Sequence, residues 1–164
     1  MPWHAAPELR GVSFARLVRT PWRCVWGADM ELEDGDPRRG SEMLHERDPR
    51  GGAPFANAMR LRTSKHRAWD ELRVRARHHE FVRYEDVARD PRGFVRTFCE
   101  RFALPRRAWF HDVTTFKGGR DRYRPKRYEP IDAEDLSWIV AELDHELELA
   151  HGYNIRARIP ELTP

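Results

Sequence analysis

The chain has 164 residues, of which 40% are hydrophobic and 35% are charged, so we expect one domain with a thin core. Its 30 Lys and Arg residues are opposed by 27 Asp and Glu residues, and a net charge of only +3 argues against a dedicated polyanion binder. No apolar run approaches the ~20 residues that a membrane helix needs, so we expect no membrane partner. Two cysteines, Cys24 and Cys99, are too few for a disulfide framework and favour the reducing cytoplasm.

The first half of the chain predicts two helices separated by a long loop. Ser13 precedes the sequence FARLVRT and then Pro21, a pattern typical of a short capped helix that a proline stops. Residues 33–54 are rich in glycine, proline and charged residues, and we interpret them as a long loop. A longer helix is expected over about residues 55–77, with Asn57 either as its cap or just inside it.

The middle of the chain contains the strongest strand candidate, EFVRY at residues 80–84, in which two adjacent apolar residues precede a tyrosine. Asp90 and Pro91 then open a helix as its N-cap and first residue. That helix carries one apolar stripe at helical spacing, formed by Phe94, Val95, Phe98, Cys99 and Phe102.

The last part of the chain predicts a polar, basic loop at residues 111–130, followed by one long helix. Asp132 can cap this helix, and Gly152 can end it in a left-handed turn. Residues 154–164 are expected to be a coil tail. A buried parallel sheet needs several strands. Because the sequence has one clear strand, we expect either a helical protein or a part of a larger α/β domain.

Three kinds of functional site have little support in the sequence: a zinc site, a Walker-type phosphate loop and an RNA-binding surface. The stretch HELELAH at residues 145–151 superficially resembles a zinc-protease helix, but Leu149 stands where the second histidine would be needed, so we expect no metal. No Walker-type phosphate loop is present. The basic stretch KGGRDRYRPKR at residues 117–127 could contact RNA, although a solvated loop is the simpler interpretation.

A family resemblance covers nearly the whole chain. The stretch EFVRYEDVARDPRGFVRTFCERFAL resembles the segment of sulfotransferases in which a strand ends in Tyr-Glu-Asp and an amphipathic helix follows Asp-Pro. Four further stretches resemble the family in the same order: PWHAAPELRGVSFARLVRTPW, NAMRLRTSKHRAWDEL, VTTFKGG and LSWIVAELDHELELAHGY. The resemblance implies an α/β fold, specifically the C-terminal half of the P-loop-like sulfotransferase fold, helix-dominated with one clear strand, as a single partial domain over residues 1–164.

The family transfers a sulfuryl group from 3'-phosphoadenosine 5'-phosphosulfate (PAPS) to an alcohol or amine. Its phosphosulfate loop, its usual catalytic base and its 3'-phosphate clamp precede the segments that this chain resembles. The resemblance therefore implies that the chain alone is catalytically incomplete, and it assigns no catalytic residue here.

What the resemblance does assign is the adenine side of the site. Tyr84 corresponds to a tyrosine that borders the adenine, and Thr114, Thr115 and Phe116 match residues that surround the base. Lys117, with the basic residues after it, lies where the family brings cations near the 3'-phosphate.

Each of these roles has an alternative. Tyr84 could be a packed residue with a tethered hydroxyl. Glu85 and Asp86 fit the bracing of a turn better than acid–base chemistry, and His4 is a weak candidate for a base. For the whole chain, the rivals are a non-catalytic helical binding domain and, less strongly, a basic RNA-binding module. The expected partners are a nucleotide and a small-molecule or glycan acceptor, with self-association through an uncovered apolar edge.

Overall fold

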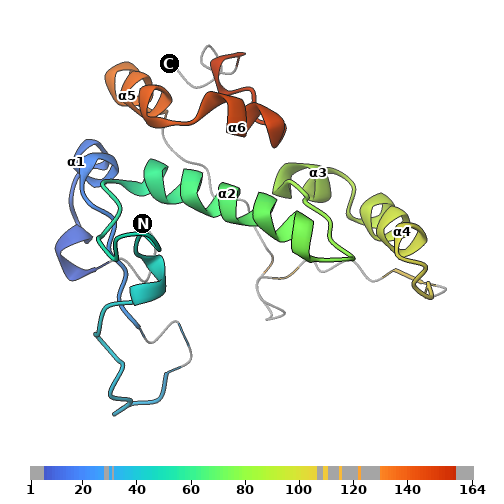
Figure 1. Ribbon diagram of the computed structural model, residues 1–164, viewed down its shortest axis with the longest axis horizontal. Coiled ribbons are helices and arrows are strands. Elements are labelled where there is room, and N and C mark those ends of the chain that lie inside the picture. The colour runs from blue at the N-terminus through green and yellow to red at the C-terminus, as the bar shows by residue number, and fades with distance from the viewer. Residues whose placement is uncertain are drawn as a thin grey trace. The chain divides into compact units, whose positions relative to one another are not determined.

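The computed structural model describes residues 6–27, 30, 32–106, 109–110, 115, 122 and 130–157, and these residues are dominated by helices (Figure 1). The elements in chain order are η1 (Pro7–Leu9), α1 (Phe14–Arg19), η3 (Leu44–Glu46), α2 (Ala58–Arg75), α3 (Tyr84–Arg89), α4 (Pro91–Arg101), α5 (Ala133–Glu142) and α6 (His145–Ala150). The helix-dominated part of the predicted fold is confirmed. Within the described ranges, none of the helices is both long and apolar enough to span a bilayer.

The chain divides into two compact units. The first consists of residues 1–72 together with 130–164, and the second consists of residues 73–129. In the first unit, the segment expected to be a long loop, 33–54, contains η3, turns and antiparallel bridges between Val25 and Glu42 and between Arg47 and Pro54.

A small apolar core holds the first unit together. It consists of Trp22, Cys24, Met43, Phe55 and Leu61. Backbone hydrogen bonds fix the segments that carry it, from Trp22 N–H to the Phe55 carbonyl at 2.8 Å and from Met43 N–H to the Cys24 carbonyl at 2.9 Å. Burial, reinforced by the nearby Glu46 carboxylate, raises the pKa of the Cys24 thiol to about 11, so this cysteine behaves as a small apolar residue.

Helix starts follow the capping residues that the sequence contains. The Arg16 N–H donates to Ser13 Oγ at 3.3 Å, the Arg60 N–H to Asn57 Oδ1 at 3.0 Å, and the Gly93 N–H to Asp90 Oδ1 at 2.8 Å. Asp132 Oδ1 accepts from the Glu134 N–H at 2.8 Å. The caps predicted for α1, α4 and α5 are therefore confirmed, and of the two alternatives for Asn57 the structure has the cap, since α2 begins at Ala58.

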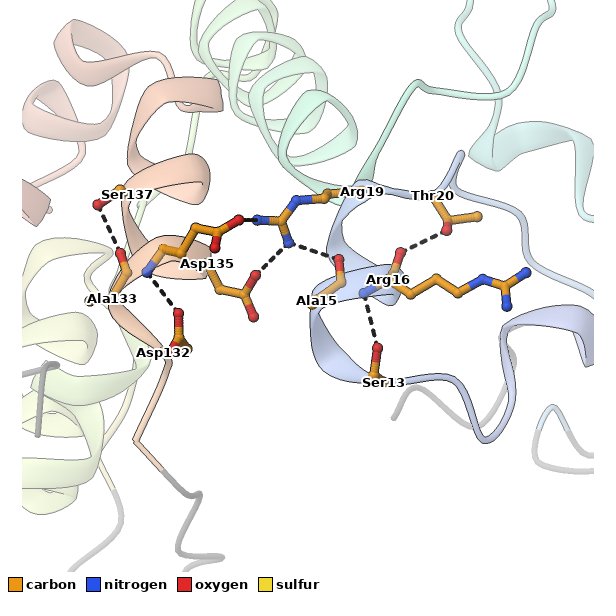
Figure 2. A network of polar contacts seen from close by, with 10 residues as sticks. Ser13, Ala15, Arg16, Arg19, Thr20, Asp132, Ala133, Asp135 and Ser137 are labelled. Carbon is orange, nitrogen blue, oxygen red and sulfur yellow. Dashed lines mark hydrogen bonds and ion pairs between the residues drawn. The ribbon is translucent and has the colours of Figure 1, made fainter.

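Polar contacts join α1 to α5 within the first unit (Figure 2). The Arg19 guanidinium forms an ion pair with Asp135, donates to the Ala15 carbonyl at 2.9 Å and lies 3.8 Å from the Glu134 carboxylate. It also lies over the Trp138 ring, 5.1 Å from its centroid. One arginine therefore connects two helices that are more than 110 residues apart in sequence.

The strand expected at residues 80–84 is not formed. Arg83 has an extended backbone, and α3 begins at Tyr84, with the N–H groups of Asp86 and Val87 donating to the Arg83 carbonyl at 3.2 Å. In the described part of the chain no neighbouring strand pairs with this segment, and an extended segment without a ladder leaves its backbone groups unpaired. The acidic first turn of α3, Glu85 and Asp86, favours a helix start instead.

The single long helix expected at the end of the chain is two helices. Leu143 has an extended backbone that ends α5, and the Asp144 side chain caps α6 by accepting the Leu147 N–H at 3.1 Å. The positive φ of 81° at Gly152 confirms the predicted left-handed turn after α6. In the expected coil tail, residue 154 has no regular structure, whereas residues 155–157 form a helical turn, so the prediction is wrong there; residues 158–164 lie outside the described residues.

Candidate functional site

Tyr84 is the only residue of the predicted adenine site that lies on a helix in the described structure. It is the first residue of α3, and it is 68% exposed. Most of the Tyr84 side chain is therefore outside any core, and the tethering of its hydroxyl stays an open alternative.

Of the two carboxylates after Tyr84, Asp86 forms ion pairs that brace the turn, and Glu85 is exposed. Asp86 accepts hydrogen bonds from Arg83 Nε at 2.6 Å and Arg83 Nη2 at 2.9 Å, and from Arg89 Nη1 at 3.3 Å. The bonds from Arg83 hold the pKa of Asp86 below its ordinary value, so this carboxylate stays ionised at neutral pH. The ion pairs with Arg83 and Arg89 agree with the bracing role predicted for Asp86, and a carboxylate held in this way is a poor general base.

The other predicted contacts are only partly described. Thr115 forms an antiparallel bridge with Arg122, so one cation of the basic stretch 117–127 lies beside this threonine. Thr114, Phe116 and Lys117 lie outside the described residues, as does His4. Three of the five predicted residues therefore lie outside the described part of the chain, and the grouping of the five stays a prediction.

Helix α4 presents its predicted apolar stripe without burying it. The ring centroids of Phe94 and Phe98 lie 5.8 Å apart, and those of Phe98 and Phe102 lie 4.7 Å apart. In the described structure no residue of α4 is fully buried, and Val95 is 41% exposed. The stripe is therefore an apolar surface of the second unit.

A polar cluster that the sequence analysis missed lies in the first unit, between α2 and α6. Nδ1 of His151 lies 2.7 Å from Nδ1 of His66, and Nε2 of His151 lies 2.9 Å from Oδ1 of Asp70. Both imidazoles are buried. Donation of the His151 Nε2–H to Asp70 and of the His66 Nδ1–H to His151 satisfies both contacts.

A buried ion pair lies beside the histidines. Glu148, which is only 1% exposed, accepts from Arg62 Nε at 2.6 Å and from Arg62 Nη2 at 2.8 Å. The Arg62 guanidinium also lies 5.0 Å from the centroid of the Tyr153 ring. The residues that contact each other here are 81 to 86 positions apart in the sequence. No local sequence pattern predicts contacts between residues so far apart. We interpret this cluster as structural, because each described contact joins α2 to the α6 region.

Comparison with protein-family models, with curated proteins and with solved structures found no match to this chain. In the described residues, no group of three or more histidine, cysteine and carboxylate side chains is arranged to hold a metal ion.

Proposed function

We propose that this chain carries the nucleotide-binding, adenine side of a PAPS-dependent sulfotransferase that acts on an alcohol or amine. The observation that carries the proposal is the segment from Tyr84 to Asp90-Pro91, with its exposed aromatic ring, braced carboxylate and capped amphipathic helix in the order of the family motif. Helix α4 lies within the segment that the resemblance assigns to a helix, and α2 covers most of the preceding helical segment and continues beyond it to Arg75. The strand that the family places before Tyr84 is not formed, so the support comes from the helices alone.

The proposed contacts have a simple physical basis. An exposed tyrosine ring offers a face on which adenine can stack, and base–aromatic stacking contributes about 1–3 kcal/mol per base. Arg122, beside Thr115, supplies a cation from the basic stretch for the 3'-phosphate. Both cysteines are free thiols, which suits a reducing compartment, and we place the protein in the cytoplasm.

Sulfuryl transfer needs more than these contacts. Charge that develops on the leaving phosphate must meet preorganised donors, and a base must accept the acceptor's proton. The sequence contains no Walker-type loop, and Asp86 is committed to Arg83. We therefore assign nucleotide binding, and no catalytic residue, to these 164 residues.

One observation favours a rival. The partly exposed apolar stripe of α4 could bind a partner protein, which would make the chain a non-catalytic binding domain. Nucleotide titration separates the two functions, because the rival requires no preference for a 3'-phosphate.

The test is a titration of the purified chain with 3'-phosphoadenosine 5'-phosphate and, separately, with AMP. We expect a Kd of about 0.1–1 mM for the bisphosphate, because only part of a full contact set is present. AMP should bind more weakly. Tyr84→Ala should weaken binding about tenfold, because it removes the stacking surface, and Tyr84→Phe should retain it.

Two outcomes would remove the assignment. One is equal affinity for AMP and the bisphosphate, which would show that the 3'-phosphate is not recognised. The other is unchanged binding by Tyr84→Ala, which would place the nucleotide elsewhere.

A further inference from the structure

The α6 segment, which we define as residues 144–153, is attached to α2 mainly through ionisable side chains. Within this segment, which the structure describes throughout, the buried residues are Glu148 and His151, and both are polar. Leu149 is 61% exposed, and the apolar core of the first unit includes no residue of the segment. A segment that buries few apolar side chains can open locally while the rest of its unit stays folded.

Two ion pairs join the segment to α2. Arg62 pairs with Glu148 at 2.6 Å, and Arg67 pairs with Asp144 at 2.7 Å. Because charged groups regain hydration when a pair separates into water, an intact ion pair contributes little net stability to docking. The Leu147 N–H and then Arg67 hold the pKa of Asp144 below its ordinary value, so Asp144 stays ionised well below neutral pH.

The contact between His66 and His151 depends on how many protons the two rings carry. Their Nδ1 atoms lie 2.7 Å apart, and this contact is a hydrogen bond only if one nitrogen donates and the other accepts. As long as one ring is neutral, its Nδ1 can accept. When both rings are protonated, two N–H groups face each other and two positive charges repel.

The surroundings of the two rings oppose a second proton. Charged or titratable groups from both elements face His66: Arg62 and Asp70 on α2, Glu148 on α6, and His151 and Tyr153 after it. Arg62 and one imidazolium balance the two carboxylates, so a second imidazolium leaves an excess of positive charge in a buried place. Burial, and then the charge of Arg62, lower the pKa of His66. The released segment therefore binds the second proton more readily than the docked one, and falling pH favours release.

We propose that the contact between His66 and His151 is a proton-operated latch, which holds the α6 segment on α2 and releases it when both rings are protonated. The release is local, because the apolar core of the first unit lies outside the segment. An isolated helix as short as α6 is marginal in water, so the released segment should lose its helical hydrogen bonds. The latch uses none of the proposed nucleotide contacts, and it would stand if that assignment failed.

The experiment is amide hydrogen exchange of the isotope-labelled full chain, followed by NMR between pH 7.5 and 5.5 and corrected for the intrinsic exchange rate at each pH. The reporters of the segment are the N–H groups of Glu148 and His151, which donate within α6. Their opening constant should rise about tenfold over this range, because release takes up one proton near the ordinary pKa of histidine. The N–H groups of Trp22 and Met43, which donate to carbonyls of the core segments, should keep their protection.

Two variants and a matched control identify the groups responsible. In His66→Asn, an amide that can donate or accept faces His151, so the pH dependence of α6 exchange should largely disappear, whatever the absolute protection. His151→Asn should have the same effect and serves if His66→Asn does not fold. His145→Asn removes another histidine of α6, one that no described hydrogen bond joins to the latch, and it should retain the tenfold rise.

The latch is overturned if the α6 amides keep the same opening constant at pH 7.5 and 5.5. It is also overturned if the Trp22 and Met43 amides lose protection in parallel with α6, because opening would then be global. A tenfold rise that persists in both histidine variants would assign the dependence to another group and would likewise remove the latch.

Discussion

Glu148 is among the most enclosed large side chains in the described part of the chain, and its charge is balanced by one residue. Arg62 meets both of its carboxylate oxygens, and this contact raises the pKa of Arg62 above its ordinary value. An ionised carboxylate at 1% exposure is stable only when it is paired in this way.

Replacing Glu148 should therefore have a large effect on stability. We expect Glu148→Gln to lower the free energy of unfolding by about 3 kcal/mol, the low end for a broken buried pair, because the Arg62 side chain is 39% exposed and keeps some hydration. Urea unfolding followed by circular dichroism measures the change. The control is Arg106→Gln, whose exposed pair with Glu100 should contribute at most about 1 kcal/mol. Equal effects of the two substitutions would contradict the burial argument.

The stability of the first unit should also depend on the protonation of His66. Burial, and then the positive charge of Arg62, lower the pKa of His66 below its ordinary 6.5, while Glu148 and Asp70 oppose this shift. The unfolded chain therefore takes up the proton first as pH falls. The contribution of His66 to stability should be constant above pH 6.5 and should fall as pH drops from 6.5 through the folded-state pKa.

Urea midpoints at a series of pH values between 7.5 and 5 measure this dependence on His66. This range lies above the region in which aspartate and glutamate side chains usually titrate. In a His66→Gln variant the slope should be reduced, whereas His145→Gln should retain it. An unchanged slope in His66→Gln would assign the dependence to another group.

At the scale of a single element, the Asp90 cap of α4 limits which side chain can stand at position 93. Asp90 accepts the Gly93 N–H at 2.8 Å, and a Cβ built on Gly93 would lie 2.0 Å from Asp90 Oδ2. The Asp90 side chain can therefore keep its capping position only if residue 93 has no Cβ.

We expect Asp90→Ala to lower stability by about 1 kcal/mol through loss of the cap. Gly93→Ala alone should give no stabilisation, although alanine is normally favoured over glycine in a helix by about 1 kcal/mol. In the Asp90→Ala background, where the clash is absent, Gly93→Ala should raise stability. Thermal unfolding of the four proteins forms a double-mutant cycle, and additive effects would show that the side chains do not interfere.

At the scale of the whole molecule, the proposed nucleotide contacts lie in the second unit, residues 73–129. Nucleotide binding should therefore respond to substitutions in that unit.

We expect the 164-residue chain alone to transfer no sulfate. Loss of one preorganised donor costs about 10²–10³ in rate, and loss of general-base assistance costs about 10²–10⁴ more. A radiolabelled PAPS assay with phenols, alcohols and amines is the direct measurement. PAPS-dependent product from the purified chain would show a complete site and would direct attention to His4, Glu85 and the basic stretch 117–127.

The sequence by itself determined the features that are encoded within a few neighbouring residues. The caps at Ser13, Asp90 and Asp132, the proline start of α4 and the left-handed turn at Gly152 agree with the structure, because each depends on local backbone hydrogen bonds or local sterics. The amphipathic pattern likewise identified α4, although it could not show that the apolar stripe stays partly exposed.

Only the tertiary structure decided the features that depend on distant partners. EFVRY has the composition of a strand, but no neighbouring strand is described, so Tyr84 begins a helix. The break before α6 occurs where Asp144 caps the helix and meets Arg67, a residue 77 positions earlier. The contact of His66 with His151 arises in the same way, because side chains far apart in sequence are positioned by the packing of whole helices.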